Sequence, residues 1–349
     1  MLNLPVLSMF GITPVHAELA SGGFSGTPVW KVVDGEGRCW ALRRLSDHSD
    51  VIRRFNAIGR LQMWLRDQGL GFVPEPARPV RRLITGPSAG KNYSINGLVC
   101  VEDGRAWMME SWMSGNCLTS EPSSSQLRET LDRLRDLHDA LKRYGERNPE
   151  PPWIQCQRDY SPGVLRRVQL VSALTSDRLR ELEVRASQDQ DAVFGSLTIR
   201  HIETLRRKLT VLRSRLTQVA EVTFSLQPVL RDLWRPHVLF EGSVLTGLID
   251  WAAMDCDHVA FDVTRLLRSW FGSDNRRVAE ALDLFARERS LSPEECQLLE
   301  TLDMATVMLS PLTWVRRRYE EMALSVVTED VRQRMEELVI IAEGYCEPA

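Results

Sequence analysis

The chain has 349 residues, of which 43% are hydrophobic and 26% charged, and its formal net charge is −3. This length can bury one large core or two lobes of ordinary domain size. A charge this close to zero gives no global attraction to nucleic acid or an anionic membrane, and no apolar run approaches the length that spans a bilayer. We therefore expect a soluble globular protein without nucleic-acid or membrane partners.

The seven cysteines are scattered along the chain and form no Cys-x-x-Cys pair. An odd number of separated thiols is typical of a reduced cytosolic protein, and it does not favour a disulfide framework or a zinc ribbon. Val15-His16-Ala17 resembles a signal cleavage site only weakly, because no basic segment precedes it and Pro5 and Pro14 interrupt a short apolar stretch. The expected location is the cytoplasm.

The first third of the chain has the pattern of a small β-rich part. After a leading helix, the pattern predicts two strands around an Asp-Gly-Glu-Gly turn, a helix, and three more strands. The predicted ranges are a helix at 1–18, a strand that follows the glycine-rich tip within 19–33, its partner strand at 39–43, a helix at 49–68, and strands near 79–85, 97–101 and 107–113.

Past Gly115 the pattern is helical. Residues 124–143 carry leucine at helical spacing, which is typical of an amphipathic helix. A hairpin over 230–250 is the β feature expected in this part. The other predicted helices cover 163–186, 193–220, 259–271, 276–288, 293–319 and 328–344.

Residues 226–251 carry the most informative pattern. Asp232 lies five residues before His237, an apolar run and a Glu-Gly turn follow, and Asp250 ends the next β-rich run within Ile-Asp-Trp. This predicts a loop, a tight hairpin and a carboxylate at a strand end. The spacing is that of a phosphotransferase catalytic loop followed by its metal-binding aspartate.

This segment resembles the aminoglycoside phosphotransferase and choline kinase-like family, small-molecule kinases with the protein-kinase fold. The order of elements extends the resemblance over nearly the whole chain. It implies an α+β, protein-kinase-like two-lobe fold: a small antiparallel-sheet N-lobe over 1–112 that binds nucleotide, and a large, mainly helical C-lobe over 113–349 that carries the catalytic loop and the acceptor-binding helices. The implied reaction transfers the γ-phosphate of ATP to a hydroxyl of a small polar molecule.

The resemblance also implies roles for single residues. Asp232 matches the catalytic base, Asp250 the magnesium ligand, and Asp262 an aspartate that braces the catalytic loop. Leu230 stands where the family has a histidine, and His237 where it has a metal-binding asparagine. Because imidazole suits Mn²⁺ or Zn²⁺ better than Mg²⁺, we expect Mg²⁺ as the cofactor, or Mn²⁺ if His237 is a second metal ligand.

Residues of the N-terminal part match the nucleotide-binding positions of the family. Arg43 stands where a kinase strand carries its phosphate-binding lysine, and arginine can bind phosphate oxygens in bidentate fashion. The usual partner is a helix glutamate, but residues 49–68 contain none, which leaves Gln62 or Asp50 as substitutes. A glycine-rich tip allows backbone N–H groups to approach phosphates closely; here it consists of Ser21, Gly22, Gly23, Phe24, Ser25 and Gly26.

Glu110, Trp112 and Met113 fall where a kinase has the hinge between its lobes, which binds the adenine edge. Large apolar groups such as Trp112 and Met113 are equally consistent with packing.

An alternative function is a catalytically impaired, nucleotide-binding pseudokinase with a regulatory role. Leu230, His237 and the missing helix glutamate favour it, whereas the presence of both aspartates favours an active enzyme. A protein kinase is disfavoured because only eleven residues separate Asp250 from Asp262 and no Ala-Pro-Glu follows. The acceptor, the choice between ATP and GTP, and the oligomeric state stay open.

Overall fold

The structure is a computed structural model that describes residues 5–20, 28–80, 93–148 and 150–346. The chain folds into two compact units. The first comprises Met1–Leu118, Ser123–Tyr144 and Pro236–Ala253, and the second Thr119–Pro122, Gly145–Arg235 and Met254–Ala349. The first unit thus extends past residue 112 and takes in two later segments of the chain.

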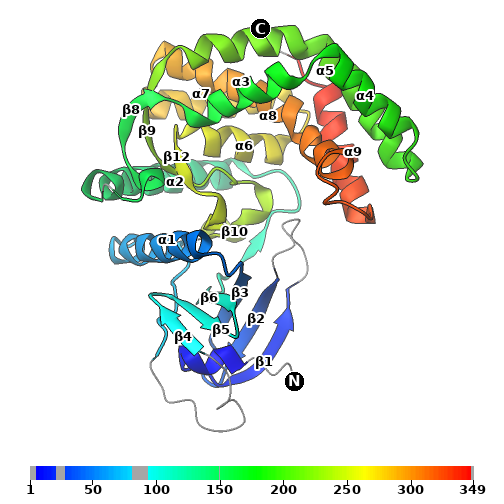
Figure 1. Cartoon of the computed structure of the whole chain (residues 1–349). Helices are drawn as coiled ribbons and strands as arrows, with labels where there is room; N and C mark the ends of the chain where they lie inside the picture. Colours follow the sequence, from blue (N-terminus) through cyan, green and yellow to red (C-terminus); the bar gives the residue numbers. More distant parts are fainter. Residues whose placement is uncertain (1–4, 21–27, 81–92, 149, 347–349) are drawn as a thin grey trace. The chain divides into compact units, whose positions relative to one another are not determined.

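A six-stranded sheet forms the basis of the first unit (Figure 1). All neighbouring strands pair antiparallel. Asp34 holds the turn between the second and third strands, because its carboxylate accepts the backbone N–H groups of Glu36 and Arg38, both at 2.9 Å. In spatial order the strands are β1 (Pro14–Leu19), β2 (Val29–Asp34), β3 (Cys39–Leu45), β6 (Arg105–Ser111), β5 (Val99–Glu102) and β4 (Tyr93–Asn96).

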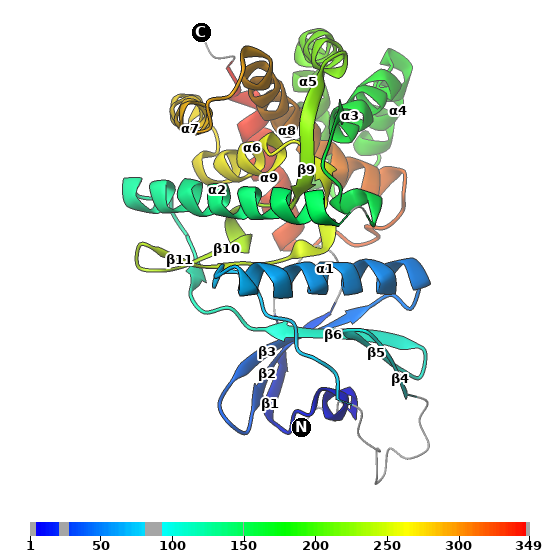
Figure 2. The same ribbon diagram turned by 90° about the vertical axis from the view of Figure 1, so that its left-hand side faces the viewer.

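Helix α1 (Ser49–Asp67) runs along one face of this sheet (Figure 2). Its Ile52 and Phe55 pack against residues of β3, β5 and β6. A short 3-10 helix, Pro5–Phe10, contributes to a second apolar cluster with Trp30 and Trp107. The sheet therefore has apolar packing on both faces.

The leading helix predicted for residues 1–18 is wrong. Among residues 5–18, which the structure describes, only Pro5–Phe10 is helical, as a 3-10 helix, and Pro14–Leu19 is strand β1. Pro14 cannot donate a backbone hydrogen bond, but the first residue of a strand tolerates this loss. The apolar spacing of the segment was too short to distinguish the two structures. The strand predicted near 79–85 falls mostly outside the described residues.

The later segments of the first unit form a helix and a small sheet. Helix α2 (Ser124–Arg147) begins within this unit and ends within the second. The small sheet has the order β11 (Val244–Leu248), β10 (Val238–Glu241) and β7 (Asn116–Cys117). Gly242, with φ of 61°, allows the tight turn between β10 and β11. The predicted hairpin is thereby confirmed.

The second unit is mainly helical (Figure 1). Its long helix α8 is buried over most of its length and packs against α5, α6 and α9. A small antiparallel sheet has the order β12 (Asp255–Asp257), β9 (Thr223–Val229) and β8 (Gln157–Tyr160). The helices are α3 (Pro162–Ala173), α4 (Ser176–Ser187), α5 (Ala192–Ala220), α6 (Ala260–Phe271), α7 (Asn275–Glu288), α8 (Pro293–Tyr319) and α9 (Glu329–Glu343).

The single helix predicted over 163–186 is wrong, because the chain forms two helices there. Helix α3 ends at Ala173, and the Thr175 side chain accepts the Arg178 backbone N–H at 3.2 Å as the N-cap of α4. This local hydrogen bond favours a new helix start over continuation. The other predicted helices of this unit are confirmed within a few residues.

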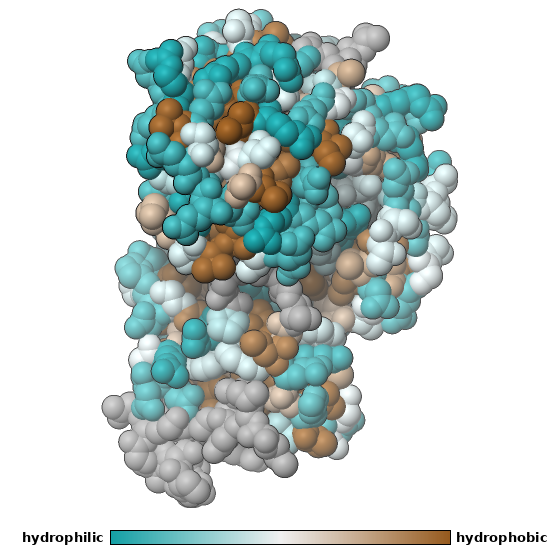
Figure 3. Space-filling model, turned by 90° about the vertical axis from the view of Figure 1, so that its right-hand side faces the viewer, coloured by the Kyte–Doolittle hydropathy of each residue, from teal (hydrophilic) through white to brown (hydrophobic). Residues whose placement is uncertain are grey.

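No helix in the described ranges is long and apolar enough to cross a membrane. On the face that Figure 3 shows, hydrophilic residues predominate and hydrophobic ones form small separate patches.

Candidate functional site

His237 and Asp250 lie at the open end of the β10–β11 hairpin. Val238 pairs with Leu248, so the residues just outside this pair meet. The Ile249 backbone N–H donates to the His237 carbonyl at 3.0 Å, and His237 Nε2 lies 3.8 Å from an Asp250 carboxylate oxygen. The hairpin therefore brings the predicted metal ligands of this unit together.

Arg43 on β3 joins this pair. One of its guanidinium nitrogens lies 3.4 Å from Asp250, and both side chains are mostly buried. Asp250 has a φ of 63°, which is uncommon for a residue with a side chain and costs energy. Such strain is typical of residues whose side chain must take one fixed direction. The structure thus places an arginine and a carboxylate that lie far apart in the sequence against each other.

Glu110 on β6 is a carboxylate close to Arg43 and Gln62. Gln62 of α1 donates to its carboxylate at 3.1 Å. Burial raises the pKa of the Glu110 carboxyl, and the positive charge of Arg43 and the Gln62 hydrogen bond oppose this rise. Of the two substitutes named from the sequence, Asp50 is instead exposed and pairs with Arg53. Gln62 therefore links α1 to the charged cluster through Glu110.

The backbone around the predicted hinge is held within the first unit. The Ser111 N–H donates to the Glu75 carbonyl at 2.8 Å, and the Trp112 N–H to the Cys39 carbonyl at 2.9 Å. Lys31 lies over the Trp112 ring, 5.3 Å from its centroid. The glycine-rich tip, Ser21 to Gly26, lies outside the described residues.

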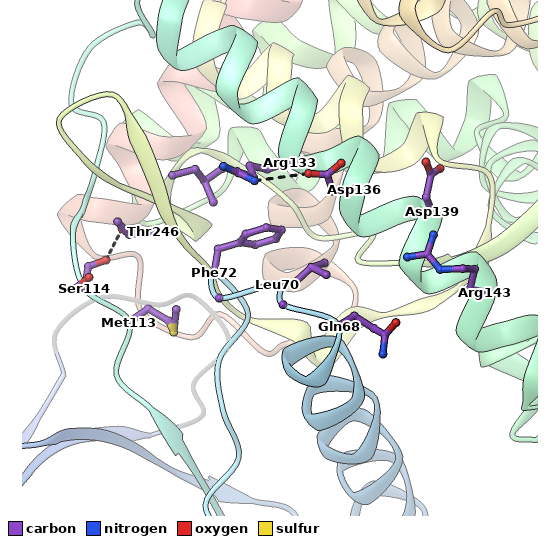
Figure 4. Close-up of a pocket in the computed structure, with 13 residues that line it drawn as sticks. Gln68, Leu70, Phe72, Met113, Ser114, Arg133, Asp136, Asp139, Arg143 and Thr246 are labelled. Atoms are coloured by element: carbon purple, nitrogen blue, oxygen red, sulfur yellow. Dashed lines mark hydrogen bonds and ion pairs between the residues drawn. The ribbon is translucent and has the colours of Figure 1, made fainter.

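Met113 lines a cavity of about 660 Å³ in the first unit (Figure 4). Leu70 and Phe72 from the segment after α1 line it too, as do polar residues of α2, including Arg133 and Asp136. Neither Arg43 nor Asp250 is among its lining residues. This cavity is therefore distinct from the cluster of charged residues around Asp250.

In the second unit, helix α6 holds the predicted catalytic loop. The Asp262 carboxylate accepts the backbone N–H groups of Leu230 at 3.1 Å and Arg231 at 2.6 Å. Two turns further along the same face of α6, the Ser269 hydroxyl accepts the Arg235 backbone N–H at 2.8 Å. Asp262 thus makes the bracing contacts that the sequence predicts.

Asp232 lies between these two anchor points. Its carboxylate forms an ion pair with Arg265, which occupies the same face of α6. Arg265 is not among the residues that the sequence pattern singles out; the available signal was its spacing of three residues from Asp262 on a predicted helix. Arg231 has a φ of 63° and binds Asp255 at 2.7 Å, so the residue before Asp232 is fixed as well.

These features define a kinase-like phosphotransferase fold: an antiparallel sheet that carries Arg43, a hairpin that ends at Asp250, and a helical part that fixes the backbone before a second aspartate. A model of the phosphotransferase enzyme family, APH, matches residues 16–299. The chain belongs to this family, and it is a small-molecule kinase of the APH type. None of the curated proteins compared with the chain matches it.

Solved structures agree on the fold. An aminoglycoside phosphotransferase from Alicyclobacillus acidocaldarius is 16% identical, with a TM-score of 0.60 over 99% of this chain and 93% of its own. A spectinomycin phosphotransferase in complex with ADP and spectinomycin is 13% identical, with a TM-score of 0.60 over 97% and 95%. An amicoumacin kinase in complex with AMP-PNP and Ca²⁺ is 13% identical, with a TM-score of 0.57 over 95% and 89%. The predicted α+β fold of the protein-kinase type is confirmed.

Proposed function

We propose that this chain transfers the γ-phosphate of ATP to a hydroxyl of a small polar molecule. The observation that carries the proposal is Asp250 at the hairpin end, with Arg43 at 3.4 Å and His237 at 3.8 Å. Phosphoryl transfer needs a carboxylate for the metal and a fixed cation for the phosphates, and this cluster offers both. Membership of the phosphotransferase family supports the same reaction.

The residues of the cluster fit a divalent cation. Carboxylate and imidazole are both metal ligands, and a gap of 3.8 Å between Asp250 and His237 is less than twice a metal–ligand distance of about 2.1 Å. Asp250 and His237 would hold Mg²⁺ or Mn²⁺, which would neutralise charge on the phosphates. With a metal held at Asp250, the Arg43 guanidinium would be available to bind a phosphate.

Asp232 serves as the base in this proposal. It accepts the proton of the acceptor hydroxyl while that oxygen attacks the γ-phosphorus, and ADP leaves. Asp262 contributes by positioning, since it fixes the backbone immediately before Asp232. The loop at 21–26 would contact the phosphates through its backbone. Adenine would contact the segment that contains Glu110, Trp112 and Met113.

The proposed organisation keeps a nucleotide-binding N-lobe at 1–112 and a C-lobe at 113–349 that holds the acceptor. The proposed location is the cytoplasm, and no disulfide joins the seven cysteines, all of which lie in the described ranges. A pseudokinase is the second candidate, because Asp232 is already neutralised by Arg265 and Asp250 by Arg43.

Calorimetry of ATP binding tests the proposal, with Mg²⁺, Mn²⁺ or EDTA, on the wild type and on Asp250→Ala. Metal-dependent binding that the substitution abolishes is expected for a kinase. Metal-independent binding, together with no turnover of any acceptor, would support the pseudokinase. Absence of binding in every condition would contradict both. Asp177→Ala, at an exposed position on α4, is the matched control.

A further inference from the structure

A cavity of about 360 Å³ lies in the second unit, lined by residues of α6, α8 and α9 and by the end of the catalytic loop. This volume is at the lower end of the range for small-molecule sites. Trp234, Trp270 and Phe271 give it apolar walls, and Ser269, Thr306 and Ser310 add hydroxyl groups. Such a lining suits a compact ligand that has both polar and apolar parts.

The cavity is connected to the proposed base. Trp234 and Arg235, two and three residues after Asp232, line it, and so does Arg265, which forms the ion pair with Asp232. All of these residues belong to the second unit, so their arrangement is internal to it. A ligand in this cavity would therefore lie against the residues that flank Asp232.

Positive charge predominates among the lining side chains. Four arginines face two glutamates, a net charge of +2. Arg268 is neutralised by a bidentate pair with the buried Asp303, at 2.8 and 2.5 Å. Arg334 is paired with Glu337 at 3.0 Å. Arg235, by contrast, forms no ion pair within the described ranges.

The positive charges of Arg235 and Arg265 act on the guanidinium of Arg334. Burial lowers the pKa of Arg334; its ion pair with Glu337 opposes this shift, and the positive charges of Arg265 and Arg235 add to it. Arg334 also lies over the Trp234 ring, 4.9 Å from its centroid, which fixes its direction. Bringing such like charges together is costly, and the cost is only partly offset here, because Asp232 pairs with Arg265 and Glu337 pairs with Arg334 whereas Arg235 has no ion pair in the described ranges. A cationic amino sugar would increase that cost, whereas a carboxylate or phosphate would relieve it.

We infer that the acceptor is a small alcohol that carries a carboxylate or phosphate group, bound by Arg235, Arg265 and Arg334, with its hydroxyl directed at Asp232. This inference rests on the proposed function and specifies its acceptor. When the anion pairs with Arg265, the ion pair between Arg265 and Asp232 weakens, and the Asp232 carboxylate can accept the hydroxyl proton. The hydroxyl oxygen then forms a bond to the γ-phosphorus of ATP, the bond from that phosphorus to the bridging oxygen breaks, and ADP leaves.

Binding is measured first, without nucleotide, by calorimetry on the full chain. The probes are gluconate and glycerol 3-phosphate as anionic alcohols, inorganic phosphate as the anion alone, sorbitol as a neutral alcohol, and glucosamine as a cationic one. We expect at least one anionic alcohol to bind, and Arg235→Gln to weaken that binding at least tenfold. Arg276→Gln, at an exposed position on α7, is the matched control and should leave it unchanged.

Arg235→Gln is preferred to Arg334→Gln because Arg235 has no ion pair to lose in the described ranges. The thermal stability of the Arg235→Gln variant is compared with that of the wild type. Preferential binding of glucosamine or sorbitol would overturn the inference, as would anion binding that Arg235→Gln leaves unchanged. Binding of phosphate but of neither anionic alcohol would also count against it, since the acceptor must present a hydroxyl.

Phosphate transfer from ATP to the bound alcohol is then measured separately. Anion binding that depends on Arg235 but occurs in a chain that binds no ATP would uphold the site and contradict the kinase proposal. If the chain binds ATP but transfers phosphate only to neutral or cationic alcohols, the kinase proposal is upheld and the anionic acceptor is contradicted. The two failures are therefore distinguishable.

Discussion

The Asp262 carboxylate accepts the Arg231 backbone N–H at 2.6 Å, and this contact joins helix α6 to the residue that precedes the proposed base. Asp262 is fully buried, so the charge of its carboxylate must be compensated by such donors. The backbone of the loop is thereby fixed from inside the helical unit.

Substitution of Asp262 by asparagine should lower both stability and turnover. The amide keeps one acceptor but places an NH₂ group against a backbone N–H, which should cost about 1–3 kcal/mol of unfolding free energy. Displacement of Asp232 by a fraction of an ångström should reduce kcat by about 10²-fold with little change in the KM for ATP. Chemical denaturation and steady-state kinetics measure the two effects. An unchanged kcat in a folded variant would refute the positioning role.

Asp232→Asn should leave the fold and ATP binding intact and lower kcat by about 10²–10⁴-fold, since the amide cannot accept the hydroxyl proton. Single-turnover phosphate transfer, with ATP affinity measured in parallel, checks this. Asp177→Asn on the exposed face of α4 should behave as the wild type. Full turnover by Asp232→Asn would mean that another group is the base.

His237→Asn should change the metal preference. It replaces an imidazole with the carboxamide that suits Mg²⁺, so the ratio of activity with Mn²⁺ to activity with Mg²⁺ should fall by about tenfold. Titration of both metals at saturating ATP measures the ratio. If the ratio is the same in both proteins, His237 does not bind the metal.

The second unit should become less stable in acid, because the Glu295 carboxylate becomes protonated there. A hydrogen bond from His258 at 3.1 Å lowers the pKa of the Glu295 carboxyl to about 2, and its bonds at the start of α8 contribute. Because the pKa is lower in the folded state than its ordinary value of 4.5, the stabilisation is complete above about pH 4.5 and is lost as the pH falls toward 2.

Glu295→Gln should therefore be less stable than the wild type at pH 7, by about 1–3 kcal/mol, and the difference should shrink between pH 5 and pH 3. Glutamine has one oxygen with which to keep the capping hydrogen bond, and it gives up the charged hydrogen bond with His258 that lowers the pKa of Glu295 most. Thermal melts across this pH range, with the exposed Glu203→Gln as control, measure it. If the stability difference between Glu295→Gln and the wild type does not change with pH, it arises from packing and not from the charge of Glu295.

Local sequence determined much of this protein. The Glu-Gly turn flanked by apolar runs predicts the β10–β11 hairpin, and antiparallel pairing then requires His237 and Asp250 to meet at its open end. The spacing of Asp232, His237 and Asp250 indicated a phosphotransferase, and the family match bears out that class. Leucine at helical spacing likewise predicted α2.

Tertiary structure alone decided the partners of these residues. The pairing of Arg43 with Asp250 and of Gln62 with Glu110 joins positions separated by 207 and 48 residues along the chain, and no local pattern encodes such contacts. At the N-terminus, pairing with β2 made a strand of a segment whose apolar spacing predicted a helix. The contact of Arg265 with Asp232 depends on which face α6 turns toward the loop. Sequence periodicity identifies a helix face, whereas the groups that this face meets depend on how distant segments pack.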